Sequence, residues 1–350
     1  MTASTADEPD ADVGERRAAS SPTKEPGRSP VGLDPNAVRR ALREAGLRAR
    51  HALSQNFLTD VEVLERIVAE AAPAPGRRIL EIGPGLGVLT GALLAQGASV
   101  VAIELDEGLE ARLAAVFEAE IEAGRRDRLG PGSLQLVRAD ALDVDLGALI
   151  VPPFDVVANL PYHITSPILH RLLGAEPRPR RAVLMVQREV AERIAARPGA
   201  MSYLSVFVQY HARVRLAFGV PATSFEPEPA VESAVVVVEP FVPTDQGAPV
   251  DRGAPPRLDA QAEAELWRLV QAAFRERRKM LHNVLARQLP LSAERVANAL
   301  EIAGIAGDRR PQTVSVEEWL RLRTALGELG PDARGRRRAG RPEGSRPESA

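Results

Sequence analysis

The chain has 350 residues, of which 45% are hydrophobic and 26% are charged, with a formal net charge of −2. This composition is that of an ordinary globular protein, and the length favours two domains, because single cores rarely grow beyond about 250–300 residues. The absence of cysteine excludes disulfides, thiolate metal sites and a cysteine nucleophile, and without an apolar run of membrane-spanning length or a secretory signal pattern we expect a cytoplasmic protein.

The near-neutral total charge conceals a basic C-terminal third. Residues 266–310 contain nine Arg or Lys against four Asp or Glu, and residues 329–350 contain six Arg against three acidic residues. Such clustering is typical of proteins that bind a polyanion. We expect residues 1–33 and 329–350 to be disordered tails, because they hold too few large apolar side chains to offset the entropy of ordering.

Regular structure is predicted from Asp34 onward. Asp34 can cap a helix that begins with Pro35 and continues with apolar residues at helical spacing. Thr59 and Glu62 have the spacing of a capping box and predict the start of a second helix. Its buried face is predicted to comprise Leu64, Ile67, Val68 and Ala71.

Strands and helices then alternate. Five predicted strands span residues 78–82, 99–104, 135–139, 154–159 and 182–187. Helices are predicted over residues 89–96 and 107–119, and this alternation favours an α/β fold with a parallel sheet covered on both faces. Two later strands, residues 210–218 and 233–241, lack a long helix between them and should add antiparallel at one edge.

The last part of the chain has a different pattern. Residues 243–258 are rich in Pro, Gly and Asp and are predicted to be a linker. Only helical periodicity follows, over residues 260–289, 292–303 and 316–326. We therefore expect a sheet-containing domain over residues 34–242 and a small all-helical domain over residues 259–328.

A glycine-rich loop, GPGLG at residues 83–87, lies between the first strand and a helix. Glycines such as Gly83 and Gly85 let main-chain N–H groups approach a ligand at a helix N-terminus. The spacing is not that of the dinucleotide fingerprint, and Pro84 removes an amide donor, so the loop is poorly suited to a pyrophosphate. Taken alone, such a loop is equally well explained as a tight turn.

Two acidic residues at successive strand ends favour a ligand-binding loop over a simple tight turn. Glu104 ends the second strand, where a carboxylate can accept hydrogen bonds from ribose hydroxyls, and Asp140 follows the third, where it can accept from an adenine amino group. The glycine loop and the two acids together indicate an adenosine-containing ligand without a pyrophosphate. S-adenosylmethionine fits this description.

The segment NLPY follows the fourth strand, at the edge of the sheet where ligands bind. An exocyclic amine is a poor nucleophile because its nitrogen donates its lone pair into the ring. The side-chain carbonyl of Asn159 and the main-chain carbonyl of Leu160 could accept from its N–H groups and direct the lone pair to a methyl donor, while Pro161 fixes the backbone. Tyr162 offers a face on which a flipped-out base can stack. Without the rest of the pattern, an Asx-Pro turn would explain the segment as well.

Several motifs in order give the chain a family resemblance. They are QNFL at residues 55–58, NLPY at 159–162, FEPEP at 225–229 and FRERRKML at 274–281. Over residues 53–326 the chain resembles the bacterial small-subunit ribosomal RNA adenine dimethyltransferase A family. The resemblance implies a Rossmann-like class I S-adenosylmethionine-dependent methyltransferase sheet with a small C-terminal all-helical domain. It also implies dimethylation of N6 of two adjacent adenosines near the 3′ end of 16S rRNA, in the small ribosomal subunit or its precursor, with a role in subunit biogenesis.

The resemblance assigns roles to individual residues. The cofactor, S-adenosylmethionine, is expected to contact Asn56, Leu58, Gly83, Gly85, Glu104, Asp140 and Asn159. Catalysis is expected to involve Asn159, Leu160 and Tyr162, with Phe225 closing over the target base. The helix that contains FRERRKML is expected to contact rRNA phosphates through Arg275, Arg277, Arg278 and Lys279. We expect a monomer without a metal site, because the histidines lack metal-ligand spacing.

Three alternatives remain open from the sequence. One is a 23S rRNA adenine dimethyltransferase of the erythromycin-resistance type, which would share the glycine loop and the N-x-P-aromatic segment. Another is a methyltransferase acting on DNA adenine or protein glutamine, although Leu160 replaces the first proline of its usual NPPY segment. The third is a non-catalytic RNA-binding assembly factor, which would not require Gly83, Glu104 and Asn159 together.

Overall fold

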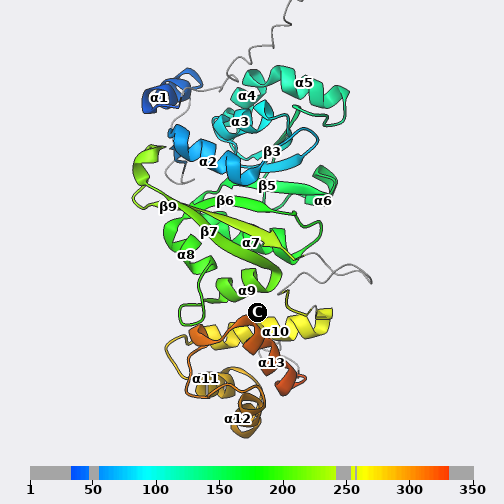
Figure 1. Cartoon of the computed structure of the whole chain (residues 1–350), viewed down its shortest axis with the longest axis vertical. Coiled ribbons are helices and arrows are strands. Elements are labelled where there is room, and N and C mark those ends of the chain that lie inside the picture. Colours follow the sequence, from blue (N-terminus) through cyan, green and yellow to red (C-terminus); the bar gives the residue numbers. More distant parts are fainter. Residues whose placement is uncertain (1–32, 47–54, 242–253, 257, 331–350) are drawn as a thin grey trace, which may run out of the picture.

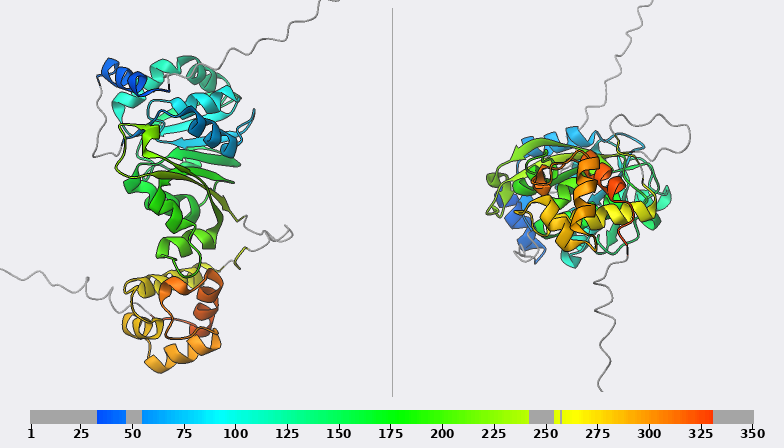
Figure 2. Two further views of the ribbon diagram at one scale, coloured as in Figure 1. Left: turned by 60° about the vertical axis from the view of Figure 1, so that its left-hand side comes forward. Right: turned by 90° about the horizontal axis from the view of Figure 1, so that it is seen from below.

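The computed structural model describes residues 33–46, 55–241, 254–256 and 258–330. Nearly all of the two predicted tails and most of the predicted linker lie outside these residues, as does the start of the family resemblance at residues 53–54. The described part is elongated, with a sheet-containing domain at one end and a helical domain at the other (Figures 1 and 2). No helix in the described ranges is long and apolar enough to cross a membrane.

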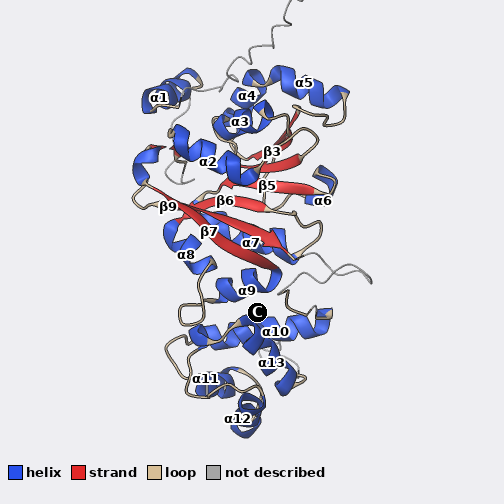
Figure 3. Ribbon diagram, viewed as in Figure 1, coloured by secondary structure: helices blue, strands red, loops and turns tan. Residues whose placement is uncertain are grey.

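The centre of the first domain is a seven-stranded sheet in the order β4-β3-β2-β5-β6-β9-β7 (Figure 3). Its strands are β2 Arg78–Ile82, β3 Ser99–Glu104, β4 Leu134–Arg138, β5 Phe154–Asn159, β6 Ala182–Gln187, β7 Ala212–Val220 and β9 Ser233–Pro240. The first five pair in parallel, and β9 lies antiparallel between β6 and β7. The predicted parallel sheet with an antiparallel addition at one edge is therefore confirmed.

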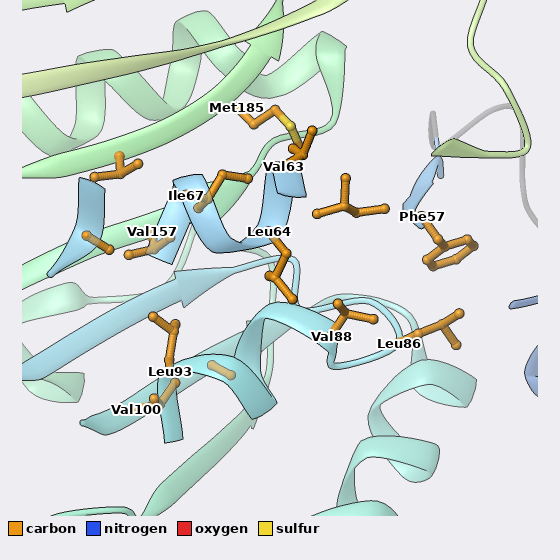
Figure 4. Packing of buried hydrophobic residues seen from close by; sticks show 14 of the residues in the cluster. Phe57, Val63, Leu64, Ile67, Leu86, Val88, Leu93, Val100, Val157 and Met185 are labelled. Atoms are coloured by element: carbon orange, nitrogen blue, oxygen red, sulfur yellow. The ribbon is translucent and has the colours of Figure 1, made fainter. Parts of the chain in front are cut away.

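Helices bury both faces of this sheet, because successive residues of each strand point to opposite sides. Ile79 packs into one core and Leu80 into the other. The helices of the first core are α1 Pro35–Glu44, α2 Val61–Ala71, α3 Val88–Ala95 and α4 Glu107–Val116, with α5 Glu118–Arg126 beside them. The helices of the second are α6 Leu146–Leu149, α7 Thr165–Gly174, α8 Arg188–Ile194 and α9 Tyr203–His211. Figure 4 shows Leu64 and Ile67 of α2 above Leu93 and Val100 in the first core.

A second, two-stranded sheet joins two distant segments. Strand β1, Phe57–Leu58, pairs antiparallel with β8, Phe225–Glu226. Two short 3-10 helices, η2 Tyr162–Ile164 and η3 Ala222–Ser224, follow β5 and precede β8. This small sheet positions the QNFL and FEPEP motifs next to each other.

The C-terminal part consists of helices around the fully buried Trp319. They are α10 Ala260–Phe274, α11 Leu281–Gln288, α12 Ala293–Ile302, η4 Pro311–Thr313 and α13 Val316–Leu326. Their core also includes Met201, Val206 and Tyr210, so α9 of the sheet domain forms part of the domain interface. Leu329 lies beyond the predicted boundary at residue 328, yet it is buried in the same core.

Two boundaries in the sheet domain differ from the prediction. The predicted helix 107–119 is two helices, because the chain turns at Phe117, whose ring lies against Gly87. The predicted strand 210–218 begins only at Ala212, because the two preceding residues end the buried helix α9. Both differences result from the burial of residues in the folded domain. The local periodicity of the sequence does not reveal this burial.

The predicted capping box at the start of α2 is also wrong. Asp60 caps this helix, since its Oδ1 accepts from the main-chain N–H groups of Glu62 and Val63 at 3.0 and 3.2 Å. Thr59 instead donates from its main-chain N–H to the carbonyl of Ser224, 2.8 Å away. Thr59, which the local sequence indicated as the cap, therefore bonds to a residue that is distant in sequence.

Candidate active site

A cleft lies at the carboxyl ends of β2 and β5, where the strand order of the sheet reverses. Open parallel sheets bind their ligands at this position. The cleft is lined by every residue predicted for cofactor binding or catalysis: Asn56, Leu58, Gly83, Gly85, Glu104, Asp140, Asn159, Leu160, Tyr162 and Phe225. The fold thus collects residues from six separate segments of the chain.

The glycine loop has the backbone that only glycine adopts readily. Gly83, Gly85 and Gly87 have φ angles of +70°, +59° and +84°. A Cβ at Gly83 would lie 3.8 Å from the main-chain oxygen of Asn159, and a Cβ at Gly85 would lie 3.3 Å from the Phe57 ring. The missing side chains therefore keep open the space between the loop, β1 and the end of β5.

Glu104 is fixed beside this loop. One carboxyl oxygen accepts from the main-chain N–H of Gly85 at 3.1 Å, and the other accepts from that of Asp106 at 2.9 Å. Because each carboxyl oxygen has two lone pairs, both retain capacity for a further donor such as a ribose hydroxyl. Burial raises the pKa of Glu104, and the hydrogen bonds from these amides act in the opposite direction.

Asp140 follows β4 on the same side of the cleft. Its Oδ1 accepts from the main-chain N–H of Leu142 at 2.8 Å, which fixes the turn after the strand. The side chain is partly exposed and lines the cleft. An amino group of a ligand can therefore reach an acceptor at this position.

The NLPY segment is held from both sides. The Nδ2 of Asn159 donates to the main-chain oxygen of Asn56 at 3.2 Å, which leaves the side-chain carbonyl oxygen as the acceptor of this amide. The main-chain N–H of Leu160 donates to Met185 in β6 at 3.0 Å. The Tyr162 hydroxyl lies 3.2 Å from that of Ser233, so the ring is fixed at the rim of the cleft.

The β1–β8 sheet borders the other side of the cleft. Leu58 lies opposite Phe225, and Phe57 opposite Glu226, in the register of this pair. Phe225 is only 3% exposed, but it contributes to the cleft wall. The side chains of Phe57, Leu86 and Val88 cluster where the glycine loop enters α3 (Figure 4).

Among the cleft residues that the sequence does not predict, three affect the shape or electrostatics of the site. Phe57 belongs to the QNFL motif without a predicted role, although its ring lies against Gly85. Leu105 is 56% exposed and lines the cleft directly after Glu104. An apolar residue directly after a strand end was the sequence feature that could have indicated its place in the site. Glu81 is buried and accepts from the Thr90 hydroxyl at 2.7 Å, and its burial raises its pKa to about 8. A single acid inside an apolar strand was a signal for this unusual carboxyl.

The four predicted RNA-binding residues lie between α10 and α11, and none of them lines the cleft. Figure 1 shows the helical domain at the opposite end of the molecule from β3 and β5. The four residues are exposed, as predicted for a charged surface: Arg275, Arg277, Arg278 and Lys279. Their expected position on a helix is wrong, because α10 ends at Phe274 and α11 begins only at Leu281. The break occurs where the main-chain N–H groups of Leu281 and His282 donate to Arg309 and Gly307, at 2.7 and 3.1 Å.

Among the described residues, no group of three or more His, Cys, Asp or Glu side chains could hold a metal ion. The cleft instead combines polar side chains, among them Glu104, Asp140 and Asn159, with apolar ones such as Leu58, Leu105 and Phe225. This arrangement suits an organic ligand with hydroxyl and amino groups.

The sheet order and the cleft together define a class I S-adenosylmethionine-dependent methyltransferase. The ribosomal RNA adenine dimethylase family matches residues 46–327, and the chain belongs to this family. It is therefore an S-adenosylmethionine-dependent enzyme that dimethylates adenine in ribosomal RNA, and the predicted family resemblance is confirmed.

Curated relatives and solved structures agree with this assignment. The chain is 41% identical over 292 residues to the ribosomal RNA small subunit methyltransferase A of Geobacter sulfurreducens, covering 81% of this chain and 98% of that relative. It is 41% identical over 295 residues to the protein of the same name from a Synechococcus species, covering 81% and 97%. The crystal structure of the 23S rRNA methyltransferase ErmE has a TM-score of 0.55 at 29% identity, covering 77% of this chain and 99% of that one. A dimethyladenosine transferase from Plasmodium falciparum, with a TM-score of 0.59 at 24% identity over 76% and 95%, shares the fold.

The residues of the cleft fit S-adenosylmethionine. Gly83 and Gly85 leave room that a Cβ would fill, and Glu104 and Asp140 supply acceptors on neighbouring strand ends. The carboxylate of Glu104 also places negative charge in the cleft, which suits a cationic ligand.

Proposed function

We propose that this enzyme dimethylates N6 of two adjacent adenosines near the 3′ end of 16S rRNA, in the small ribosomal subunit or its precursor, and so contributes to subunit biogenesis. The supporting observation is the similarity over nearly the full length of relatives named small subunit methyltransferase A, at up to 41% identity, against 29% for the 23S enzyme. The proposal places the protein in the cytoplasm and treats it as a monomer.

In this proposal, Asn56, Leu58, Gly83 and Gly85 surround the cofactor, Glu104 accepts from its ribose hydroxyls and Asp140 from its adenine amino group. When bound, S-adenosylmethionine supplies a methyl group on a positively charged sulfur. The protein residues position this group against the target nitrogen, and proximity and orientation account for much of the rate.

The NLPY segment prepares the target amine. Before the first transfer, the side-chain oxygen of Asn159 and the main-chain oxygen of Leu160 accept from the two N–H groups of the amine, so the nitrogen lone pair turns out of the purine plane and toward the methyl donor. The hydrogen bond from Asn159 to Asn56 fixes the side-chain amide so that its oxygen remains the acceptor. After transfer, the proton on the nitrogen leaves to solvent, and no strong base is needed.

Two aromatic residues hold the base. Tyr162, restrained by Ser233, stacks on one face of the flipped-out adenine, and Phe225 of β8 closes on it from the opposite wall. Leu105, which is exposed directly after β3 and lines the cleft, would pack on the adenine of the cofactor.

The helical domain, residues 259–328 in this proposal, contacts rRNA phosphates through Arg275, Arg277, Arg278 and Lys279. These side chains project from an exposed turn rather than from a helix face. The turn is braced by Glu276, which accepts from Gln288 at 2.8 Å and pairs with Arg287 at 3.1 Å.

Methyl transfer from radiolabelled S-adenosylmethionine to purified subunits tests the proposal. Small subunits lacking this modification and large subunits are incubated in parallel with the full-length protein, and labelled nucleosides are identified after digestion. We expect dimethyladenosine from small subunits alone. Label in large subunits would indicate the resistance-type activity instead, and tight binding to small subunits without label would indicate an assembly factor. An Asn159→Ala variant is the control for label that does not come from the cleft.

A further inference from the structure

Helix α1 lies outside the part of the chain that the family matches, which begins at residue 46. It nevertheless packs into the same core as the cleft wall, through Ala37, Val38, Ala41 and Leu42. Its N-terminus is capped by Asp34, which accepts from the main-chain N–H of Ala37 at 2.8 Å. The helix is therefore a fixed part of the sheet domain.

One side chain of α1 contacts the FEPEP motif directly. The guanidinium of Arg39 donates through Nε to one carboxyl oxygen of Glu226 at 2.8 Å and through Nη2 to the other at 2.9 Å. Two parallel hydrogen bonds of this kind fix orientation as well as distance. The same contact lowers the pKa of Glu226, so its carboxylate is ionised in neutral solution.

Glu226 belongs to the two-stranded β1–β8 sheet, and we call this small sheet the clamp. Glu226 follows Phe225 directly and lies opposite Phe57, whose neighbour Asn56 accepts the hydrogen bond from Asn159. Arg39 thus connects through Glu226 to the aromatic residue over the target base and, across the clamp, to the residue beside the target amine.

Hydrogen bonds also hold the opposite end of the clamp, next to Leu58 and Phe225. Thr59 donates to the main-chain oxygen of Ser224 from its N–H at 2.8 Å and from its hydroxyl at 3.1 Å, and the Ser224 hydroxyl donates to Asp60 at 2.7 Å. Each strand of the clamp is only two residues long. A pair of strands this short needs stabilising contacts at both ends to keep its register.

We propose that Arg39 is a positioning residue for the methyl-transfer reaction: by holding Glu226 it fixes the clamp, and with it Phe225, against the target base. This inference rests on the proposed role of Phe225. The Arg39 side chain is 57% exposed and that of Glu226 is 19% exposed, and such ion pairs contribute little to global stability. Loss of the pair should therefore change turnover more than folding.

The test compares four full-length variants with the wild-type protein: Arg39→Ala, Arg39→Lys, Glu226→Gln, and the charge exchange Arg39→Glu with Glu226→Arg. Arg43→Ala, an exposed arginine of the same helix, is the matched control. Thermal stability, affinity for S-adenosylmethionine, and kcat and KM on whichever subunit the wild-type protein methylates are measured for each.

We expect Arg39→Ala and Glu226→Gln to lower kcat about tenfold through misplacement of Phe225, with the melting temperature and cofactor affinity nearly unchanged. Arg39→Lys should lie between these variants and the wild type, because Lys cannot make the paired contact. The charge exchange should recover most of the activity, and Arg43→Ala should resemble the wild type.

Two results would overturn the inference. One is a kcat for Arg39→Ala equal to that for Arg43→Ala. The other is a loss of kcat that follows the loss of thermal stability and is not recovered by the charge exchange. A wild-type preference for large subunits would overturn the proposed function alone, because the variants are compared on the substrate that is methylated.

Discussion

Asn159 donates its side-chain N–H to the main-chain oxygen of Asn56 at 3.2 Å, across 103 residues of sequence. This hydrogen bond joins the end of β5 to the segment before β1, and both residues line the cleft. Since the bond uses the amide nitrogen, it determines which atom of Asn159 is left to accept from a target amine. The orientation of the catalytic side chain therefore depends on the N-terminal segment.

This relationship predicts that the nitrogen and the oxygen of Asn159 are both required. Asn159→Ala should lower kcat by roughly 10²-fold or more, the range seen when one aligned hydrogen-bonding group is removed from an active site. Asn159→Asp should also be impaired, because a carboxylate repels the carbonyl of Asn56 instead of donating to it. Steady-state kinetics on small subunits measure both effects, with Asn298→Ala, on the exposed side of α12, as the control. Full activity of Asn159→Asp would contradict the role of the amide nitrogen.

Glu104 allows cofactor binding to be separated from RNA binding. Glu104→Ala should abolish detectable binding of S-adenosylmethionine, because the variant loses the ribose acceptor and the anchor for Gly85 and Asp106. Binding to small subunits should persist, since the proposed RNA surface lies in the other domain. Calorimetry with the cofactor and filter binding with subunits give the two readouts. Glu107→Ala changes an exposed carboxylate outside the cleft and should leave both unchanged. Methyl transfer by Glu104→Ala would refute the cofactor assignment.

The part of the cleft formed by the glycine loop, Glu104, Asp140 and NLPY could be predicted from the sequence, because these residues lie at strand ends. Asn56, Leu58 and Phe225 were expected only from the family resemblance. The four parallel strands that carry the glycine loop, Glu104, Asp140 and NLPY were located to within about one residue. Strand ends that meet at one edge of a parallel sheet then bring these residues together without further information.

The connections between distant segments could not be predicted in this way. The bond between Asn56 and Asn159 and the ion pair between Arg39 and Glu226 depend on tertiary geometry. The same is true of the break between α10 and α11, where hydrogen bonds to residues 307–309 override a continuous helical pattern. Periodicity reports the burial of a face but does not identify the partner that buries it.

Buried Glu81 predicts an unusual dependence of stability on pH. Burial raises its pKa from 4.5 to about 8 in the folded protein, so between these values the folded state holds a proton that the unfolded state has released. The free energy of unfolding should therefore fall as pH rises through this window, by at most about 1.4 kcal/mol per pH unit from this group. Below pH 4.5 the contribution is complete, and above about pH 8 it is lost.

Glu81→Gln tests this dependence, because the amide stays neutral and can still accept from Thr90. Urea unfolding from pH 5 to 9 should show a shallower decline for the variant than for the wild-type protein. Glu301→Gln, exposed on α12, controls for removing a carboxylate elsewhere. Parallel curves for Glu81→Gln and the wild type would mean that Glu81 is ionised in the folded protein.

Removing arginines from the exposed turn between α10 and α11 should change the salt dependence of rRNA binding. The double variant Arg277→Ala, Arg278→Ala removes two cations that we propose contact phosphates, so fewer counterions are released when rRNA binds. The slope of log affinity against log salt should become shallower by roughly 1 to 2, and affinity at low salt should fall. Methylation at saturating subunit concentration should persist, since neither residue lines the cleft.

The matched control for this prediction is Arg125→Ala, Arg126→Ala. These two arginines are also exposed, but they lie on α5, at the opposite end of the molecule from α11 (Figure 1). Removing them lowers the net charge of the protein by the same amount, so a general effect of charge would shift both double variants equally. A slope that changes only when the α10–α11 turn is altered would locate the phosphate contacts there, whereas an unchanged slope would exclude this turn as the RNA surface.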